Sequence, residues 1–228
     1  MRWLKLGHIF DPHDYKLSTE CFSHARAPQA VKYSDFIRVF FCSQTKLING
    51  KCVSIPQFCD FELNFKKVIN TSKKEIINLG NLGEFDEHGI FPLSVSSEGE
   101  DIFAFTTGWS RRYSVPIEMS IGLAKFNNKK NMFDKFGKGG PILTSKFNEN
   151  CMVGDAHVKK INGIWFMWYI FSKGWLISNK NSKPERHYRI SFATSKDLIN
   201  WERKNEFIVP TLIENECQAM PTVFYHKR

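Results

Sequence analysis

Asp86-Glu87-His88-Gly89-Ile90-Phe91-Pro92 places a polar cluster directly before an apolar segment, and this arrangement recurs along the chain. The three related stretches are His24-Ala25-Arg26-Ala27-Pro28-Gln29-Ala30-Val31, Gly154-Asp155-Ala156-His157-Val158 and Glu216-Cys217-Gln218-Ala219-Met220-Pro221-Thr222-Val223. Pro28 and Pro92 lie 64 residues apart, Pro92 and His157 lie 65 apart, and His157 and Pro221 lie 64 apart. A fixed period of this length is typical of a repeat architecture in which each repeat is one structural unit.

Each complete repeat contains four short segments whose apolar residues predict β-strands. In the third repeat we expect strands at 155–160, 164–171, 188–193 and 201–209, with Asn162-Gly163 as a two-residue hairpin turn. The 164–171 segment is apolar throughout, as expected for a strand covered on both faces. Matching strands are expected at 89–96, 102–108, 119–126 and 133–143, and at 29–32, 36–42, 53–63 and 65–69. Since helical periodicity is absent, the sequence predicts an all-β fold, a β-propeller of four-stranded blades.

The length and composition predict one domain. The chain has 228 residues, 42% of them hydrophobic, which is enough to bury a large core. We expect a single partial propeller over 1–228, with blades at about 24–80, 84–145, 152–210 and 214–228. The fourth repeat holds only one inner strand and a turn, so we expect three blades and the start of a fourth in a truncated chain.

The charge and cysteine patterns narrow the class of partner. The net charge is +9, but the lysines are scattered and no nucleic-acid-binding motif is present, so we expect no nucleic-acid partner. A diffuse positive field favours an anionic ligand such as an acidic or phosphorylated sugar.

No run is long enough to span a membrane and the N-terminus lacks a signal peptide's apolar core, which predicts a cytoplasmic protein. The six cysteines lack zinc-site spacing and predict free thiols, with no metal and no cofactor.

Several motifs resemble the blades of the five-bladed β-propeller glycoside hydrolases. They are Gly83 to Pro92, Thr107-Gly108-Trp109, Ile121-Gly122-Leu123-Ala124, Phe166-Met167-Trp168-Tyr169 and Ala193 to Trp201. The resemblance runs from about Trp3 to Arg228 and covers glycoside hydrolase families 43, 32, 68 and 130, with relatives found beside surface-polysaccharide genes. It implies a carbohydrate in the central funnel and a link to surface-polysaccharide metabolism.

Three acids in the repeated clusters are candidates for catalysis. Glycoside cleavage uses two carboxyl groups, a proton donor and a base or nucleophile, and the predicted catalytic residues are Asp86, Asp155 and Glu216. Because strand residues alternate between faces, we expect Asp86 and His88 to share one face, and Asp155 and His157 to share one face. The alternative is that these residues cap strand ends and bind loops.

The first repeat departs from the hydrolase pattern because 24–29 contains no acid. His24 and Arg26 there predict a contact with an oxyanion, a carboxylate or phosphate on the sugar, since a guanidinium matches such groups. The other predicted substrate-binding residues are His88, Trp109, Arg112 and His157. For Trp109 the alternative is packing between blades.

Two functions therefore fit the sequence. The first is a glycoside hydrolase or related glycosyl-transferring enzyme, which the resemblance favours. The second is a non-catalytic carbohydrate-binding propeller or an inactive remnant, which the missing first-repeat acid favours. A protein-interaction platform is a third option, because propellers often serve that role.

Overall fold

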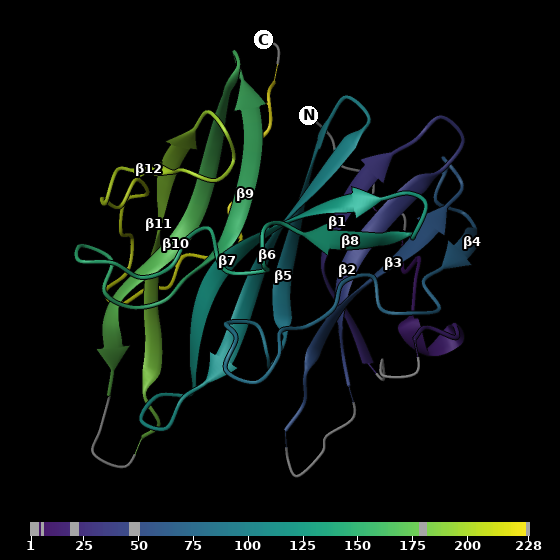
Figure 1. The fold of residues 1–228 in the computed structure, drawn as a ribbon. Helices are drawn as coiled ribbons and strands as arrows, with labels where there is room; N and C mark the ends of the chain where they lie inside the picture. The colour runs from purple at the N-terminus through teal and green to yellow at the C-terminus, as the bar shows by residue number, and fades with distance from the viewer. Residues whose placement is uncertain (1–4, 6, 19–22, 46–50, 178–181, 227–228) are drawn as a thin grey trace.

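The computed structural model describes residues 5, 7–18, 23–45, 51–177 and 182–226, and the fold is almost entirely β (Figure 1). Three four-stranded antiparallel sheets follow one another along the chain. Blade 1 is β1 (Ser23–Lys32), β2 (Ile37–Gln44), β3 (Ser54–Phe61) and β4 (Val68–Thr71). Blade 2 is β5 (Ile90–Glu98), β6 (Asp101–Arg111), β7 (Ile117–Asn127) and β8 (Met132–Lys135). Blade 3 is β9 (Val153–Ile161), β10 (Ile164–Leu176), β11 (Glu185–Ser195) and β12 (Glu202–Arg203). A short 3-10 helix, η1 (Pro12–Asp14), precedes them, and the predicted all-β fold of four-stranded blades is confirmed.

The hairpin between β9 and β10 has the predicted turn. Asn162 and Gly163 both have positive φ, +49° and +82°, as a type I′ turn requires. The strand that follows differs from the expectation of cover on both faces. Trp165, Met167 and Tyr169 are buried, whereas the alternate residues Phe166 and Trp168 are only half-buried. One face of β10 therefore points into the core and the other lies near the surface.

Blade 2 lies between the other two blades and forms a core with each. Its inner strand β5 contacts both β1 and β9. Facing blade 1, Ala104 and Phe126 join a cluster with Phe40 and Phe58. Facing blade 3, the second cluster includes Phe105, Ile121, Met167 and Tyr169. Face-to-face packing of this kind is what orders consecutive blades around a propeller.

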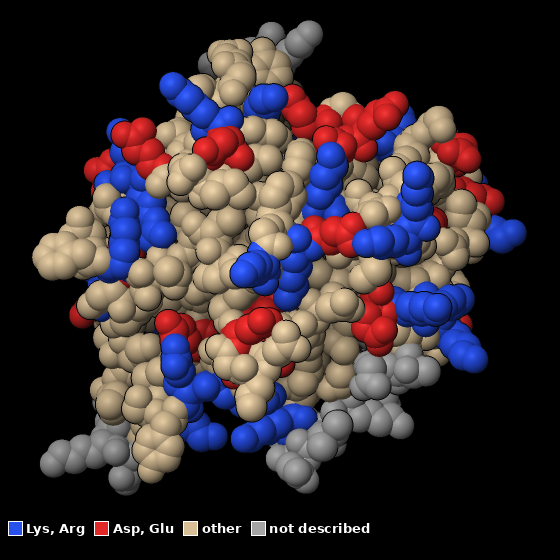
Figure 2. Space-filling view, viewed as in Figure 1, with Lys and Arg blue, Asp and Glu red and all other residues tan. Residues whose placement is uncertain are grey.

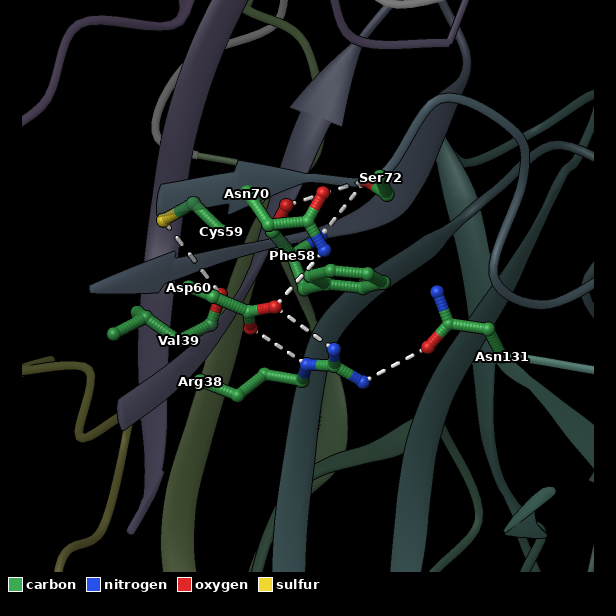
Figure 3. A network of polar contacts seen from close by, with 8 residues as sticks. All are labelled: Arg38, Val39, Phe58, Cys59, Asp60, Asn70, Ser72 and Asn131. Atoms are coloured by element: carbon green, nitrogen blue, oxygen red, sulfur yellow. Dashed lines mark hydrogen bonds and ion pairs between the residues drawn. The ribbon is translucent and has the colours of Figure 1, made fainter. Parts of the chain in front are cut away.

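A buried polar network ties blade 1 to blade 2 (Figure 3). The Arg38 guanidinium donates to Asp60 Oδ1 at 2.7 Å and Oδ2 at 2.9 Å, and to Asn131 Oδ1 at 2.9 Å. It also lies 3.8 Å from the centre of the Phe58 ring. Asn70 donates to the same carboxylate at 3.0 Å. A β-hairpin of blade 2 is thereby held against the first sheet.

Each inner strand begins with an irregular backbone. The strand pairing shifts register between Arg26 and Gln29 in β1, between Ile90 and Leu93 in β5, and opposite Asp155 in β9. Positive φ values occur at Ala27 (52°), Asp155 (51°) and, in the fourth repeat, Met220 (52°). Bulges of this kind re-aim side chains beside functional sites. The repeated polar clusters thus coincide with a repeated backbone feature.

The end of the third repeat and the fourth repeat contain less strand than expected. In place of a strand over 201–209, β12 has two residues, and within the described part of 204–226 no strand is assigned. The chain runs beside β11 and makes isolated backbone hydrogen bonds with it. Lys204 N donates to Phe192 O, and Ile208 N donates to Ile190 O. Gln218 then binds the Tyr188 carbonyl through its backbone N–H. The segment therefore lies against blade 3 without forming a ladder.

Charged side chains of both signs are interspersed on the face of the molecule shown in Figure 2. This mixture matches the scattered lysines of the sequence. Among the described residues, no helix is both long and apolar enough to cross a bilayer.

Candidate functional site

Asp86 lies in a turn before β5 and is completely buried. Its Oδ2 accepts a hydrogen bond from Lys135 Nζ at 2.6 Å, while Oδ1 has no partner. Burial raises the pKa of this carboxyl, and the neighbouring ammonium partly offsets that effect. The strand alternation expected for Asp86 and His88 does not apply, because these residues form a turn and not a strand. His88 instead lies 3.2 Å from Glu87 Oε1 through its Nδ1.

Asp155 lies at the bulge of β9 and is partly buried. Its backbone N–H donates to Thr107 Oγ1 at 2.8 Å, and its Oδ2 accepts from Met220 N at 3.3 Å. Burial raises the pKa of Asp155 from 3.8 to about 6, against the opposing effects of the Met220 N–H and Arg186. A carboxyl with this pKa carries a proton in a useful fraction of molecules near neutral pH.

Asp86 and Asp155 lie on opposite faces of the blade 2 sheet. A Cβ on Gly108 of β6 would meet the Asp86 Cβ at 2.4 Å, so Asp86 covers that face. The side chain of the preceding residue, Thr107, binds the Asp155 backbone on the other face. Because successive strand residues point to opposite faces, Gly108 and Thr107 place Asp86 and the Asp155 backbone on different faces of this sheet.

Glu216 belongs to the segment that contacts Asp155. Its carboxylate accepts hydrogen bonds from Gln218 Nε2 at 2.6 Å and from the N–H groups of Leu212 and Ile213 at 3.1 and 3.2 Å. These bonds, led by that of Gln218, lower the pKa of Glu216. The structure thus gives these two acids opposite tendencies, Asp155 toward the protonated form and Glu216 toward the ionised form.

Three predicted binding residues meet around Gly89. Its backbone pairs with Ser54, and a Cβ there would lie 2.8 Å from Trp109 Nε1. His88 stacks on Trp109 with ring centres 6.2 Å apart, and Arg26 donates to Ser54 Oγ at 3.2 Å. Trp109 also joins the apolar cluster between blades 2 and 3, which is the packing between blades expected as the alternative.

The other three predicted binding residues lie elsewhere. His24 is exposed and its Nδ1 is 2.6 Å from Ser23 Oγ. Arg112 is exposed and pairs with Glu118. His157 is buried, with its Nε2 3.0 Å from the Val223 carbonyl, and burial lowers its pKa. His157 and Asp155 both contact the 220–223 segment.

Sequence reasoning missed Arg111, which is half-buried beside its exposed neighbour Arg112. Arg111 Nη2 donates to the Cys52 carbonyl at 2.7 Å, and its backbone N–H lies 3.4 Å from His88 Nδ1. Strand alternation at the end of β6 was the available signal, since it turns two adjacent arginines to different surroundings.

A pocket of about 550 Å³ lies beside these residues. Its charged lining residues are Glu84, Glu87, Arg111, Arg112, Glu118 and Lys138.

Potential metal ligands are dispersed among the described residues. Within those ranges, no group of three or more His, Cys, Asp or Glu could hold a metal ion. Cys52, Cys59, Cys151 and Cys217 are free thiols, and Cys21 lies outside the described residues.

Comparison of sequences finds distant relatives. No family model matches the chain. Proteins described as uncharacterized from two strains of Mycobacterium tuberculosis are 23% identical over 224 residues, which cover 98% of this chain and 72% of theirs.

Comparison of structures identifies the fold. A β-1,2-mannobiose phosphorylase from Listeria innocua, in complex with β-1,2-mannobiose, matches 84% of this chain and 62% of its own with a TM-score of 0.60 and 15% identity. A glycosyl hydrolase from Bacteroides ovatus matches 82% and 49%, with a TM-score of 0.54 and 17% identity. A glycoside hydrolase family 32 β-fructofuranosidase from Bombyx mori matches 79% and 36%, with a TM-score of 0.54 and 7% identity. The chain therefore spans less than two thirds of these solved chains. Its fold is that of the five-bladed β-propeller glycoside hydrolases, as the blade motifs predicted.

Proposed function

We propose that this protein binds a glycoside at the bulged ends of its inner strands and cleaves or transfers it, with Asp155 as the proton donor. The observation that carries the proposal is the Asp155 carboxyl, whose burial raises its pKa to about 6 at a bulge of an inner strand. A general acid works best when its pKa lies near the working pH. Carbohydrate-active enzymes with the same fold supply the class of substrate.

Glu216 is the proposed base. Its pKa is lowered while that of Asp155 is raised, and two carboxyls with separated pKa values are how glycoside-cleaving sites divide the acid and base roles. Asp155 would give its proton to the leaving oxygen, and Glu216 would take a proton from the attacking water. Asp86 is proposed to hold the turn before β5 through Lys135, because its carboxyl is enclosed on the other face of β6.

The finer features of the proposal rest on composition and resemblance. The net charge of +9 supports an acidic or phosphorylated sugar as the ligand. The free thiols support a reducing compartment, the cytoplasm. The blade motifs resemble those of glycoside hydrolase relatives found beside surface-polysaccharide genes. This resemblance supports a part in surface-polysaccharide metabolism.

The test compares turnover and affinity across three variants. Asp155→Asn and Glu216→Gln should each lower the hydrolysis of aryl glycosides in a neutral and acidic sugar panel by about 10²- to 10⁴-fold, with sugar affinity within a few-fold of the wild type. Glu214→Gln is the matched control, because Glu214 is exposed and lies two residues from Glu216. Wild-type turnover in Asp155→Asn would overturn the role of Asp155.

A non-catalytic carbohydrate-binding propeller is the second candidate. It is favoured by the hydrogen bonds that occupy the Glu216 carboxylate, since a base so engaged must break them to act. Calorimetry that detects sugar binding by wild-type protein, with no turnover of any glycoside in the panel, would establish this alternative over the enzyme.

A further inference from the structure

Two arginines from different repeats lie against one short stretch of chain, residues 52–54. Arg26 of β1 donates from Nη2 to Ser54 Oγ at 3.2 Å, and Arg111 of β6 donates from Nη2 to the Cys52 carbonyl at 2.7 Å. Ser54 in turn pairs with Gly89, directly after His88. The two guanidinium groups therefore converge on the place where the first two blades meet.

Aromatic rings hold both arginines in position. The Arg26 guanidinium carbon lies 4.0 Å from the centre of the Phe91 ring, and that of Arg111 lies 5.3 Å from the centre of Trp109. Cation–π contacts orient a guanidinium without neutralising its charge. These contacts use the faces of the guanidinium groups and not the N–H groups at their edges.

Neither guanidinium has a carboxylate partner among the residues that the structure describes. Elsewhere in the same part of the chain, the buried arginines Arg38 and Arg203 bind Asp60 and Glu149. Within the described ranges, Arg26 and Arg111 are half-buried and bind only a hydroxyl and a carbonyl, and Arg26 Nε is buried without a hydrogen-bond partner there. A partly desolvated charge without a counter-ion is costly, which makes such a site receptive to an anion.

The surroundings add positive charge. Burial is the largest effect that lowers the pKa of His88. The positive charges of Arg111 and Lys51 lower this pKa further. Glu87, which raises that pKa, is the acid beside this histidine. The charged groups that act on His88 are thus two cations, Arg111 and Lys51, and one carboxylate, Glu87.

We infer that Arg26 and Arg111 form an oxyanion subsite that recognises a carboxylate or phosphate covalently carried by the sugar ligand. The guanidinium N–H groups that do not bind residues 52–54 offer donors for the anion. This inference rests on the proposed carbohydrate binding, and it assigns the ligand's charge to two named residues from two repeats.

The test measures binding of the full chain to an array of neutral, uronic-acid and sugar-phosphate glycans, with inorganic phosphate as a separate competitor. We expect preferential binding of the anionic glycans, weakened at least tenfold in Arg26→Gln and in Arg111→Gln, which is about 1.4 kcal/mol each. Lys129→Gln removes the same charge from an exposed position on blade 2 and should leave binding unchanged. Circular dichroism and thermal melting would establish that the variants are folded.

The outcomes separate this inference from the proposed function. Equal binding of neutral and anionic glycans, unaffected by either arginine variant, would overturn the subsite and leave the carbohydrate function standing. Inorganic phosphate that binds as tightly as every anionic glycan would also overturn it, because the anion would then not be part of the sugar. Failure to bind any glycan would remove both proposals.

Discussion

At the scale of single residues, Gly89 sets the spacing between the first two repeats. Its φ is +144°, and a Cβ atom would lie 2.7 Å from Ser54 N and 2.8 Å from Trp109 Nε1. Gly89→Ala therefore adds backbone strain and two close contacts, and we expect it to lower the free energy of unfolding by about 3 kcal/mol. Urea denaturation measures the change.

Gly99→Ala is the control for strain alone. Gly99 has a φ of +60°, but a Cβ there meets no atom within 4 Å. We expect a loss of about 1–2 kcal/mol. Equal losses in the two variants would show that the close approach at Gly89 contributes nothing.

Asp155 should make stability depend on pH in an identifiable way. Its folded-state pKa of about 6 lies above the ordinary 3.8, so the folded chain holds this proton more tightly than the unfolded chain. Folding stability from this group is therefore greatest below about pH 4 and falls as pH rises to about 6, by up to about 3 kcal/mol. Unfolding of wild type and Asp155→Asn at pH 4, 5, 6 and 8 should show that the variant gains stability relative to wild type as pH rises. A constant difference across that range would contradict the raised pKa.

At the scale of elements, the Arg38 network should control how blade 1 is joined to blade 2. Asp60→Ala leaves the Arg38 guanidinium buried without its carboxylate, and we expect a loss of about 3–5 kcal/mol in urea unfolding. Asn131→Ala removes one neutral acceptor and should cost about 1–3 kcal/mol. The double variant Arg38→Met/Asp60→Leu should recover stability relative to Asp60→Ala, because it removes the unpaired charge. Without that recovery, the loss would have to come from packing.

The sequence predicted the blades and a turn well, but it predicted less well which way individual side chains point. The 64- to 65-residue period predicted the blades because each repeat forms one structural unit, and the Asn162-Gly163 turn predicted a hairpin because its backbone preference is local. The face occupied by Asp86 could not be predicted by alternation, since the residues before β5 form a turn. The setting of Glu216 depends on a loop held by Gln218, whose tertiary contacts leave no local pattern.

At the scale of the whole molecule, the two outer blades differ in how their free faces are covered. On blade 1, Phe41, Cys59 and Phe61 are each about 1% exposed under Phe10 and its neighbours. On blade 3, Phe166, Trp168 and Phe192 remain half-buried. Since blade 2 packs on both sides, the stability of the whole assembly depends on how its outer blades are covered.

Phe10 should therefore be a stabilising residue although it lies outside the blades. Its ring centre is 5.3 Å from that of Phe41 and 6.3 Å from that of Phe61. Phe10→Ala would open this face to water, and we expect a loss of about 1–3 kcal/mol with increased binding of a hydrophobic dye such as ANS. Ile9→Ala is the matched control, because Ile9 is 42% exposed and should cost less than about 1 kcal/mol. If Phe10→Ala melts at the wild-type temperature and binds no additional dye, blade 1 does not need this cover, and the packing between blades alone stabilises the sheet.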